Sequence, residues 1–325
     1  MRVSVHRESW PMRAPFAITG HVFESLESVV VMLEQDGATG RGEGVPVYYL
    51  QEEARGLLEQ IEAIRPALEA GIGRAELQDM LPPGGARNAV DCALWDLEAN
   101  RTGKTVWELT GIEPAARKTA YTLGIQETPE MMAEQAAQAR GYPLLKIKLN
   151  GDKPVERVAA IRKARPDAEI IIDANQGFSI SLLKSVLEPF AELGVAMVEQ
   201  PLPRGDDAEL EGVTSPIPLC ADESCLHRGE LPDALKRYDM INIKLDKTGG
   251  LTEALALAKE ARQAGKGLMV GNMLGTSLSM APAFVIAQLC DFVDLDGPLN
   301  LKSDIPAGMA YRDGMVSASQ SGFWG

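Results

Sequence analysis

The sequence predicts an α/β fold, a modified TIM barrel of the (β/α)7β type with an N-terminal α+β capping domain. Short apolar runs alternate with helical stretches from about residue 118, successive runs end about 25 residues apart, and polar side chains end most of them. The runs end near Leu123, Lys148, Asp173, Glu199, Asp222, Lys244, Gly271 and Asp296. One strand and one crossover helix fill a unit of this length, so eight such runs predict a parallel barrel.

The segment before the barrel has a different pattern. Val29–Leu33 is an apolar run that leads into Asp36-Gly37, a tight-turn signal, and residues 38–44 return as a second strand. The glycines of this return strand lack the strand-loop-helix context of a phosphate loop. From about Glu52 to Leu109, apolar residues recur at intervals of three and four, which is typical of helices.

The domain division follows from this change of pattern. The last apolar run, which ends at Asp296, has no room for a full helix before the C-terminal tail. We therefore expect a capping domain over residues 1–115, a barrel over residues 116–297, and a tail over residues 298–325 that returns to complete the capping domain.

Composition and charge exclude several classes of function. The chain has 325 residues and a net charge of -14, which argues against binding to nucleic acid or an anionic membrane surface. Four cysteines and three histidines are too few for a disulfide framework or a histidine-rich metal site. No apolar stretch reads as a signal peptide or a membrane span. We expect a cytoplasmic protein, and the sequence does not determine whether it forms a homo-oligomer.

Two lysines stand in the second predicted barrel strand, where apolar residues are expected. Side chains alternate along a strand, so Lys146 and Lys148 point to one face and Ile147 to the other. Neighbouring ammonium groups in a partly dry site lower the pKa of a lysine toward the range of a general base. The alternative is an exposed edge strand with two solvated lysines.

Three carboxylates end three consecutive strands, at Asp173, Glu199 and Asp222. Any one of them could be the N-cap of a helix. Held together without a cation, the three would repel and raise one another's pKa. All-oxygen ligation with positions left open for water and substrate predicts Mg²⁺ rather than zinc.

Barrel geometry adds a second base. The strands of Lys148 and Lys244 are four apart in a ring of eight, so these lysines face each other across the barrel mouth. A substrate carboxylate bound to the metal then presents its α-carbon between two amines, and the metal and Lys146 stabilise the enediolate formed by proton loss. One lysine removes the proton and the other returns one to the opposite face, which inverts the stereocentre. Asn242, Lys244 and Asp246 are expected on one face of the sixth strand.

Two further aspartates, Asp294 and Asp296, belong to the last strand, opposite the predicted metal. They suit a cationic group at the far end of the substrate. A molecule with a carboxylate at one end and an ammonium across the barrel mouth has about the length of a dipeptide. The alternative is that these aspartates cap the final loop.

With these residues in place, the chain resembles the mandelate racemase and muconate cycloisomerase branch of the enolase superfamily, and within it the dipeptide epimerases of the L-Ala-D/L-Glu type. The resemblance covers essentially the whole length, and the paired aspartates are its most specific element. The matching stretches are Ala86–Ala89, Ala93–Leu97, Leu144–Leu149, Val198–Pro203, Ala221–Cys225, Asn242–Gly250 and Asp294–Pro298.

The resemblance implies a role for each candidate residue. It implies Lys148 and Lys244 as the acid/base pair and Asp173, Glu199 and Asp222 as Mg²⁺ ligands. It places Lys146 on the substrate carboxylate, Asp294 and Asp296 on the dipeptide ammonium, and Thr122 and Met273 in the pocket lining. The activity implied is Mg²⁺-dependent epimerisation at the C-terminal residue of a dipeptide, such as L-Ala-L-Glu to L-Ala-D-Glu in cell-wall peptide metabolism.

The capping loop departs from the glutamate-specific pattern. Such relatives often present an arginine from the loop near residue 20, but here residues 19–23 read Thr-Gly-His-Val-Phe. His21 is the one candidate cation in that loop, and Phe23 suits an apolar side chain. A preference for glutamate therefore stays open.

Three alternative functions share part of this pattern. A lyase or cycloisomerase such as o-succinylbenzoate synthase or muconate cycloisomerase would use the same metal and lysines but would not need the two strand-8 aspartates. A Schiff-base aldolase would use Lys148 or Lys244 without metal and would leave the three carboxylates unexplained. A non-catalytic binding protein on the same barrel is the third, since a fold does not determine function.

Overall fold

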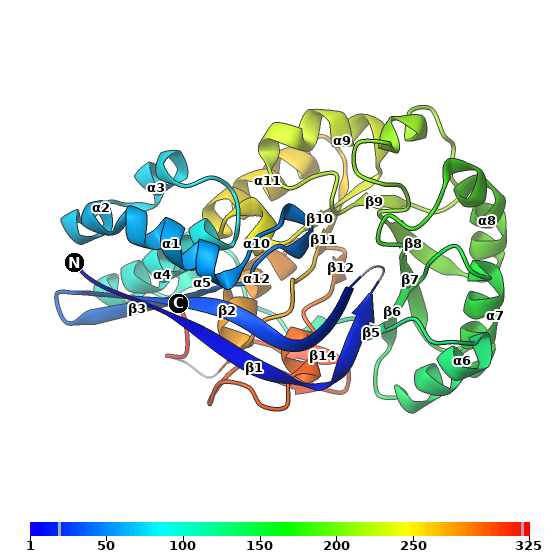
Figure 1. Cartoon of the computed structure of the whole chain (residues 1–325), viewed down its shortest axis with the longest axis horizontal. Coiled ribbons are helices and arrows are strands. Elements are labelled where there is room, and N and C mark those ends of the chain that lie inside the picture. The colour runs from blue at the N-terminus through cyan, green and yellow to red at the C-terminus, as the bar shows by residue number, and fades with distance from the viewer. Residues whose placement is uncertain (19–20, 320–321) are drawn as a thin grey trace.

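A computed structural model of the chain describes residues 1–18, 21–319 and 322–325. An antiparallel sheet with its helices lies beside a curled, eight-stranded parallel sheet (Figure 1). The predicted fold class is therefore confirmed. Within the described residues, no helix is both long and apolar enough to cross a lipid bilayer.

The N-terminal part begins with an antiparallel sheet in the order β1 (Arg2–Ile18), β2 (His21–Gln35) and β3 (Ala38–Gly44). The predicted tight turn joins β2 to β3, with Asp36 and Gly37 both at positive φ, as a two-residue hairpin requires. The helical segment that follows comprises η1 (Tyr48–Leu50), α1 (Ala54–Ala63), α2 (Arg65–Ala70), α3 (Arg74–Met80), α4 (Gly85–Thr102) and α5 (Val106–Thr110).

The glycines of β3 allow that strand to lie directly on α4. A Cβ atom on Gly40 would collide with the backbone at Ala93, and one on Gly42 would collide with the backbone at Ala89. These glycines lie two apart on the strand and so share a face, while the two alanines lie four apart on the helix. Their function is close packing between strand and helix.

The eight parallel strands follow one another in chain order around the barrel. They are β5 (Tyr121–Leu123), β6 (Leu144–Lys148), β7 (Glu169–Asp173), β8 (Val195–Glu199), β9 (Leu219–Ala221), β10 (Met240–Ile243), β11 (Gly267–Val270) and β12 (Phe292–Val293). The amide of Ala120 donates to the carbonyl of Val293 at 2.7 Å, which links the chain just before β5 to β12 and closes the ring.

Helices cover the outside of the barrel (Figure 1). The connection from β8 to β9 contains the short 3-10 helix η2 in place of a full crossover helix. The connecting elements are α6 (Pro129–Gln138), α7 (Pro154–Ala164), α8 (Ile180–Glu192), η2 (Asp207–Leu210), η3 (Arg228–Glu230), α9 (Leu231–Arg237), α10 (Leu245–Thr248), α11 (Leu251–Gln263), α12 (Ser277–Ala287) and η4 (Gly297–Asn300).

Alternation along the strands divides the barrel core into two clusters. In β6, Leu144 packs with interior side chains such as Ile171 and Met197, whereas Leu145 and Ile147 pack in the cluster between strands and helices. Lys146 and Lys148 share the parity of Leu144 and therefore face the interior. This confirms the predicted alternation and excludes the exposed-edge alternative, because both lysines are buried.

The end of the C-terminal tail returns to the N-terminal part. Trp324 Nε1 donates to the carbonyl of Arg41 at 3.0 Å, and the amide of Gly325 donates to Asp96 at 2.8 Å. Earlier in the tail, β14 (Met315–Ser317) pairs with β13 (Ala310–Arg312) on one side and with β4 (Arg117–Lys118) on the other. The predicted division at residues 115 and 298 stays a prediction.

The two parts of the chain are joined by buried carboxyl groups. Asp246 Oδ1 accepts hydrogen bonds from the amide of Val45 at 2.8 Å and from Asn88 Nδ2 at 2.7 Å. The prediction that Asp246 shares a strand face with Lys244 is wrong, because β10 ends at Ile243 and Asp246 lies in the one-turn helix α10. Its side chain therefore serves the junction between the two parts.

This junction predicts a stability that falls as pH rises. Glu43 of β3 is the second carboxyl group of this junction, because its Oε2 accepts from the amide of Thr276 at 3.2 Å. Burial raises the pKa of Glu43 from 4.5 and of Asp246 from 3.8 to about 7 in each case. The folded state then holds these protons more tightly than the unfolded state, so stabilisation present in acid is lost as pH rises through 7. Each group contributes about 2 kcal/mol over the interval from pH 5.5 to pH 8, so urea unfolding should give a free energy about 4 kcal/mol lower at pH 8. Glu43→Gln should reduce this difference; an unchanged difference would contradict the assignment.

Candidate active site

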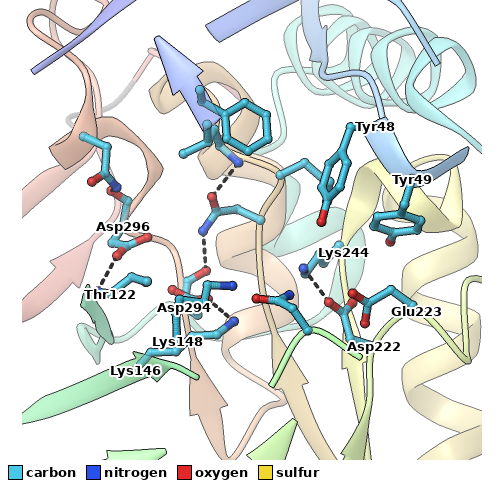
Figure 2. A pocket seen from close by; sticks show the side chains of 16 residues that line it. Tyr48, Tyr49, Thr122, Lys146, Lys148, Asp222, Glu223, Lys244, Asp294 and Asp296 are labelled. Atoms are coloured by element: carbon cyan, nitrogen blue, oxygen red, sulfur yellow. Dashed lines mark hydrogen bonds and ion pairs between the residues drawn. The ribbon is translucent and has the colours of Figure 1, made fainter. Parts of the chain in front are cut away.

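A pocket opens at the C-terminal ends of the barrel strands, where the N-terminal part covers the barrel mouth (Figure 2). Most of the predicted site residues line it. The lining residues are Phe23, Tyr48, Tyr49, Thr122, Lys146, Lys148, Asn175, Asp222, Glu223, Lys244, Asn272, Met273, Leu274, Asp294, Asp296 and Asn300. Two predicted residues do not line it, Asp173 and Glu199, and these are fully buried beneath it in contact with its lysines.

Strand register brings the predicted metal ligands together. Lys148 pairs with Asp173 between β6 and β7, and Asp173 pairs with Glu199 between β7 and β8. Asp222 lies directly after β9, the next strand in the ring. The three carboxylates therefore end neighbouring strands at one edge of the barrel. Below them, Asn242 Nδ2 of β10 donates to Glu199 Oε1 at 2.7 Å.

Lysine ammonium groups neutralise these acids. Lys146 Nζ lies 3.0 Å from Asp173 Oδ2 and 2.8 Å from Glu199 Oε2. Lys148 Nζ lies 2.7 Å from the same oxygen of Asp173. Lys244 Nζ lies 2.7 Å from Asp222 Oδ2. Lys146 and Lys148 of β6 and Lys244, directly after β10, therefore contact the same cluster of carboxylates from two sides.

The predicted lowering of lysine pKa is wrong for Lys146, and the pKa of Lys244, for which no shift was predicted, is raised as well. Burial alone would lower the pKa of each ammonium. For Lys146, however, the nearby carboxylates of Asp294, Glu199 and Asp173 hold the pKa well above its usual value. Asp222 does the same for Lys244. The prediction considered the neighbouring ammonium groups, but the carboxylates lie within ion-pair distance and decide the direction.

The pKa values of two of the carboxylates, Glu199 and Asp173, are shifted in opposite directions. Burial, and then the charge of Asp173, raise the pKa of Glu199 to about 7. Burial also acts to raise the pKa of Asp173, but Lys148 and Lys146 outweigh it and lower that pKa to about 2. The repulsion between Asp173 and Glu199 is the effect that a bound divalent cation would relieve.

The donor set fits a hard divalent cation. Asp173, Glu199 and Asp222 are buried carboxylates from adjacent strand ends, and all-oxygen sites of this kind suit Mg²⁺. Within the described part of the chain, no three acidic, cysteine or histidine side chains are already gathered as a metal site. The ammonium of Lys146 lies between Asp173 and Glu199 instead.

Asp294 and Asp296, which follow β12 rather than belonging to it, form a second acidic pair on one side of the pocket (Figure 2). Asp294 Oδ2 accepts from Lys146 Nζ at 2.8 Å, and its other oxygen is buried with no hydrogen-bond partner in the described structure. Asp296 Oδ2 accepts from the amide of Thr122 at 2.8 Å. Asp296 precedes η4 but its side chain makes no capping hydrogen bond there, which weakens the loop-cap alternative. An acidic pair with an unused oxygen is suited to bind a cation.

Lys247 was missed by the sequence analysis. This fully buried lysine donates to the backbone carbonyl of Asp222 at 2.6 Å, to Asp222 Oδ1 at 2.5 Å and to the carbonyl of Asn242 at 2.9 Å. Lys247 and Lys244 therefore hold one carboxylate oxygen of Asp222 each. The sequence signal was a second lysine three positions after the first, directly behind a barrel strand.

The pocket wall contributed by the capping part was also missed. Tyr48 and Tyr49 of η1 line the pocket together with Glu223, opposite Asp294 and Asp296 (Figure 2). The hydroxyl of Tyr49 and Oε2 of Glu223 are buried and have no hydrogen-bond partner among the residues described. An aromatic pair directly after the β2–β3 hairpin was the available signal. In the capping loop, residues 19–20 and the side chain of His21 lie outside the described structure, whereas Phe23 is in the pocket.

Comparison with known proteins identifies the family. The model of the mandelate racemase/muconate lactonizing enzyme N-terminal domain matches residues 1–111, and that of the enolase C-terminal domain matches residues 131–322. The chain belongs to the mandelate racemase/muconate lactonizing enzyme family. The resemblance inferred from the sequence motifs is thereby confirmed.

Members of this family resemble the chain over nearly its whole length. It is 46% identical to the L-Ala-D/L-Glu epimerase of Escherichia coli (strain K12), over 96% of this chain and 98% of the relative. An enolase family member from Agrobacterium tumefaciens, solved with sodium and L-Ala-L-Glu, is 42% identical, with a TM-score of 0.96 and 99% of each chain covered. A dipeptide epimerase from Enterococcus faecalis V583, solved with Mg and L-Leu-L-Tyr, is 29% identical, with a TM-score of 0.91 over 98% of this chain and 96% of that one.

Proposed function

We propose that the protein is an isomerase, a Mg²⁺-dependent dipeptide epimerase that inverts the α-carbon of the C-terminal residue. The observation that carries the proposal is the meeting of Lys148 and Lys244, from strands four apart in the barrel, in one pocket that Asp222 also lines, above the buried Asp173 and Glu199. The dipeptide epimerases among the relatives support this reaction class.

Each candidate residue has a role in this reaction. Asp173, Glu199 and Asp222 would hold Mg²⁺, which supplies Lewis-acid stabilisation of negative charge on the substrate carboxylate. Lys146 binds the same carboxylate. A cation held by Asp222 would offset the carboxylate charge that raises the pKa of Lys244. One of Lys148 and Lys244, in its neutral form, takes the α-proton as the C–H bond breaks, and the ammonium of the other delivers a proton to the opposite face of the enediolate.

The other end of the substrate meets the acidic pair. Asp294 and Asp296 bind the dipeptide ammonium, and Thr122 and Met273 line the pocket between the two ends. L-Ala-L-Glu is one candidate substrate, in line with the name of the relative from E. coli and with cell-wall peptide metabolism. A cytoplasmic location and assembly into a homo-oligomer stay predictions.

Deuterium exchange tests the proposed function. The protein is incubated in D₂O with a panel of L-Ala-L-Xaa dipeptides, with and without Mg²⁺, and mass spectrometry follows incorporation at the C-terminal α-carbon. Exchange accompanied by formation of the D-epimer is expected in the samples with Mg²⁺ and not in those without it. Absence of exchange with every dipeptide would refute the proposal.

Two observations distinguish the proposed epimerase from the alternative enzymes. A Schiff-base aldolase would act without metal and would be trapped covalently by borohydride. An o-succinylbenzoate synthase or muconate cycloisomerase would leave Asp294 and Asp296 without a function. The unused oxygen of Asp294 favours a substrate with an ammonium group over both.

Asp296→Asn should weaken binding of dipeptides with a free amino terminus. The change removes the charge but keeps an oxygen that can accept from the Thr122 amide. A hydrogen bond to a charged group contributes about 1.5–3 kcal/mol, so KM should rise about 10- to 100-fold. Steady-state kinetics with L-Ala-L-Xaa and its N-acetyl derivative measure this, and the N-acetyl derivative should show a smaller change.

A matched control is available at the other end of the same strand. Asp291 precedes β12, where it accepts from the amide of Leu268 at 2.8 Å and pairs with Arg262, outside the pocket. Asp291→Asn should leave KM unchanged. An equal KM for wild type and Asp296→Asn would overturn the assignment of the ammonium site.

A further inference from the structure

The pocket has an apolar wall once the proposed roles of its charged residues are assigned. Phe23, Tyr48, Tyr49, Met273 and Leu274 line it and belong to one hydrophobic cluster between the capping strands and the barrel mouth. The rings of Phe23 and Tyr48 pack edge to face at 5.7 Å between centroids, and those of Tyr48 and Tyr49 at 5.1 Å. The wall is therefore continuous with a packed core.

In the described part of the lining, every cation is assigned to the reacting end of the substrate. The lysines of the lining, Lys146, Lys148 and Lys244, are each within 3.0 Å of a carboxylate. Among the lining residues that the structure describes, no other positively charged side chain is present. A second carboxylate on the substrate would be desolvated here without a partner, which is costly.

Glu223 stands on the same side of the pocket. It is 1% exposed, lines the pocket beside Tyr48 and Tyr49, and leaves Oε2 without a hydrogen-bond partner in the described residues (Figure 2). An apolar side chain would meet the aromatic and aliphatic groups of the wall.

By elimination, the wall faces the side chain of the C-terminal substrate residue. The substrate carboxylate goes to Lys146 and to the metal that Asp173, Glu199 and Asp222 would hold. The ammonium goes to Asp294 and Asp296, and the α-carbon lies between the two bases. We propose that the enzyme selects dipeptides with an apolar or aromatic C-terminal side chain over those with glutamate. This inference rests on the proposed function and names its substrate class.

A kinetic comparison of matched dipeptides tests the inference with the wild-type protein. The values of kcat/KM for exchange with Mg²⁺ are measured for L-Ala-L-Leu, L-Ala-L-Phe, L-Ala-L-Gln and L-Ala-L-Glu. Burial of an apolar side chain against the wall should make the leucine and phenylalanine values at least about 10-fold higher than the glutamate value. The glutamine value should lie between them, because glutamine has the shape of glutamate without its charge.

The outcomes separate this inference from the function on which it rests. A glutamate value equal to or above the leucine value would overturn the substrate class and leave dipeptide epimerisation intact. Exchange with none of the dipeptides would overturn the proposed function and this inference with it. Both results come from the wild-type protein, so misfolding of a variant cannot affect them.

A charge added to the wall provides a second test. Phe23→Arg should raise the ratio of glutamate to leucine kcat/KM at least about 10-fold, because it supplies a cation at the pocket surface. Val22→Arg is the matched control: Val22 precedes Phe23 in β2, its side chain points to the other face, and it is 56% exposed. The control should leave the ratio unchanged; equal ratios in both variants would contradict the wall assignment.

Discussion

Lys148→Ala is expected to abolish interconversion of the two dipeptide epimers while α-proton exchange from one epimer survives. Lys148 and Lys244 approach the pocket from opposite sides of the barrel, so in the proposed reaction each would serve one face of the α-carbon. With one base removed, the remaining lysine still takes a proton from its own face and returns a deuteron to that face. Exchange without inversion is the result.

Lys244→Ala should show the same behaviour with the opposite epimer. Loss of one general acid or base costs about 100- to 10,000-fold, and inversion needs both groups, so the epimerisation rate should fall by at least the upper part of that range. The measurement is mass-resolved exchange in D₂O from each pure epimer, with chiral chromatography to follow inversion. Each variant should retain exchange from one epimer only, and the retained epimer should differ between the two.

A lysine outside the pocket controls for general effects of lysine removal. Lys236 pairs with Asp233 on the exposed side of α9, 2.8 Å away. Lys236→Ala should keep wild-type exchange and inversion. If Lys148→Ala still interconverts the epimers at the wild-type rate, the two-base assignment is wrong.

The residues whose place depends on strand periodicity could be predicted from the sequence. Alternation placed Lys146 and Lys148 together on the interior face of β6, and the repeat length placed Asp173, Glu199 and Asp222 at neighbouring strand ends. These positions depend on backbone geometry, which a parallel barrel repeats at each strand. Local sequence is therefore sufficient to place these residues on the barrel.

Properties that depend on distant partners could not be predicted. The pKa of Lys146 depends on Asp294, 148 positions away, and Asp246 turns toward Val45 and Asn88 of the capping part. Tyr48 and Tyr49 reach the pocket because η1 packs over the barrel mouth. Long-range packing decides each of these, and periodicity carries no information about it.

Removal of divalent metal is expected to abolish activity without unfolding the protein. Metal stabilisation of a developing enediolate is worth several kcal/mol, so activity after EDTA treatment should fall at least about 1,000-fold and return with Mg²⁺. The fold should persist, because each of Asp173, Glu199 and Asp222 already has a lysine partner in the structure. Circular dichroism of the EDTA-treated protein should therefore match that of the untreated protein.

A pair of variants on one strand locates the metal. Asp173 and Glu169 stand at opposite ends of β7, and Glu169 pairs with Lys118 at the end away from the pocket. Asp173→Asn should weaken Mn²⁺ binding, measured by electron paramagnetic resonance of free Mn²⁺, and should remove most of the thermal stabilisation that added Mg²⁺ gives. Glu169→Gln should change neither. Unaltered Mn²⁺ affinity in Asp173→Asn would place the metal elsewhere, because a ligand at the barrel mouth cannot lose its charge without loss of affinity.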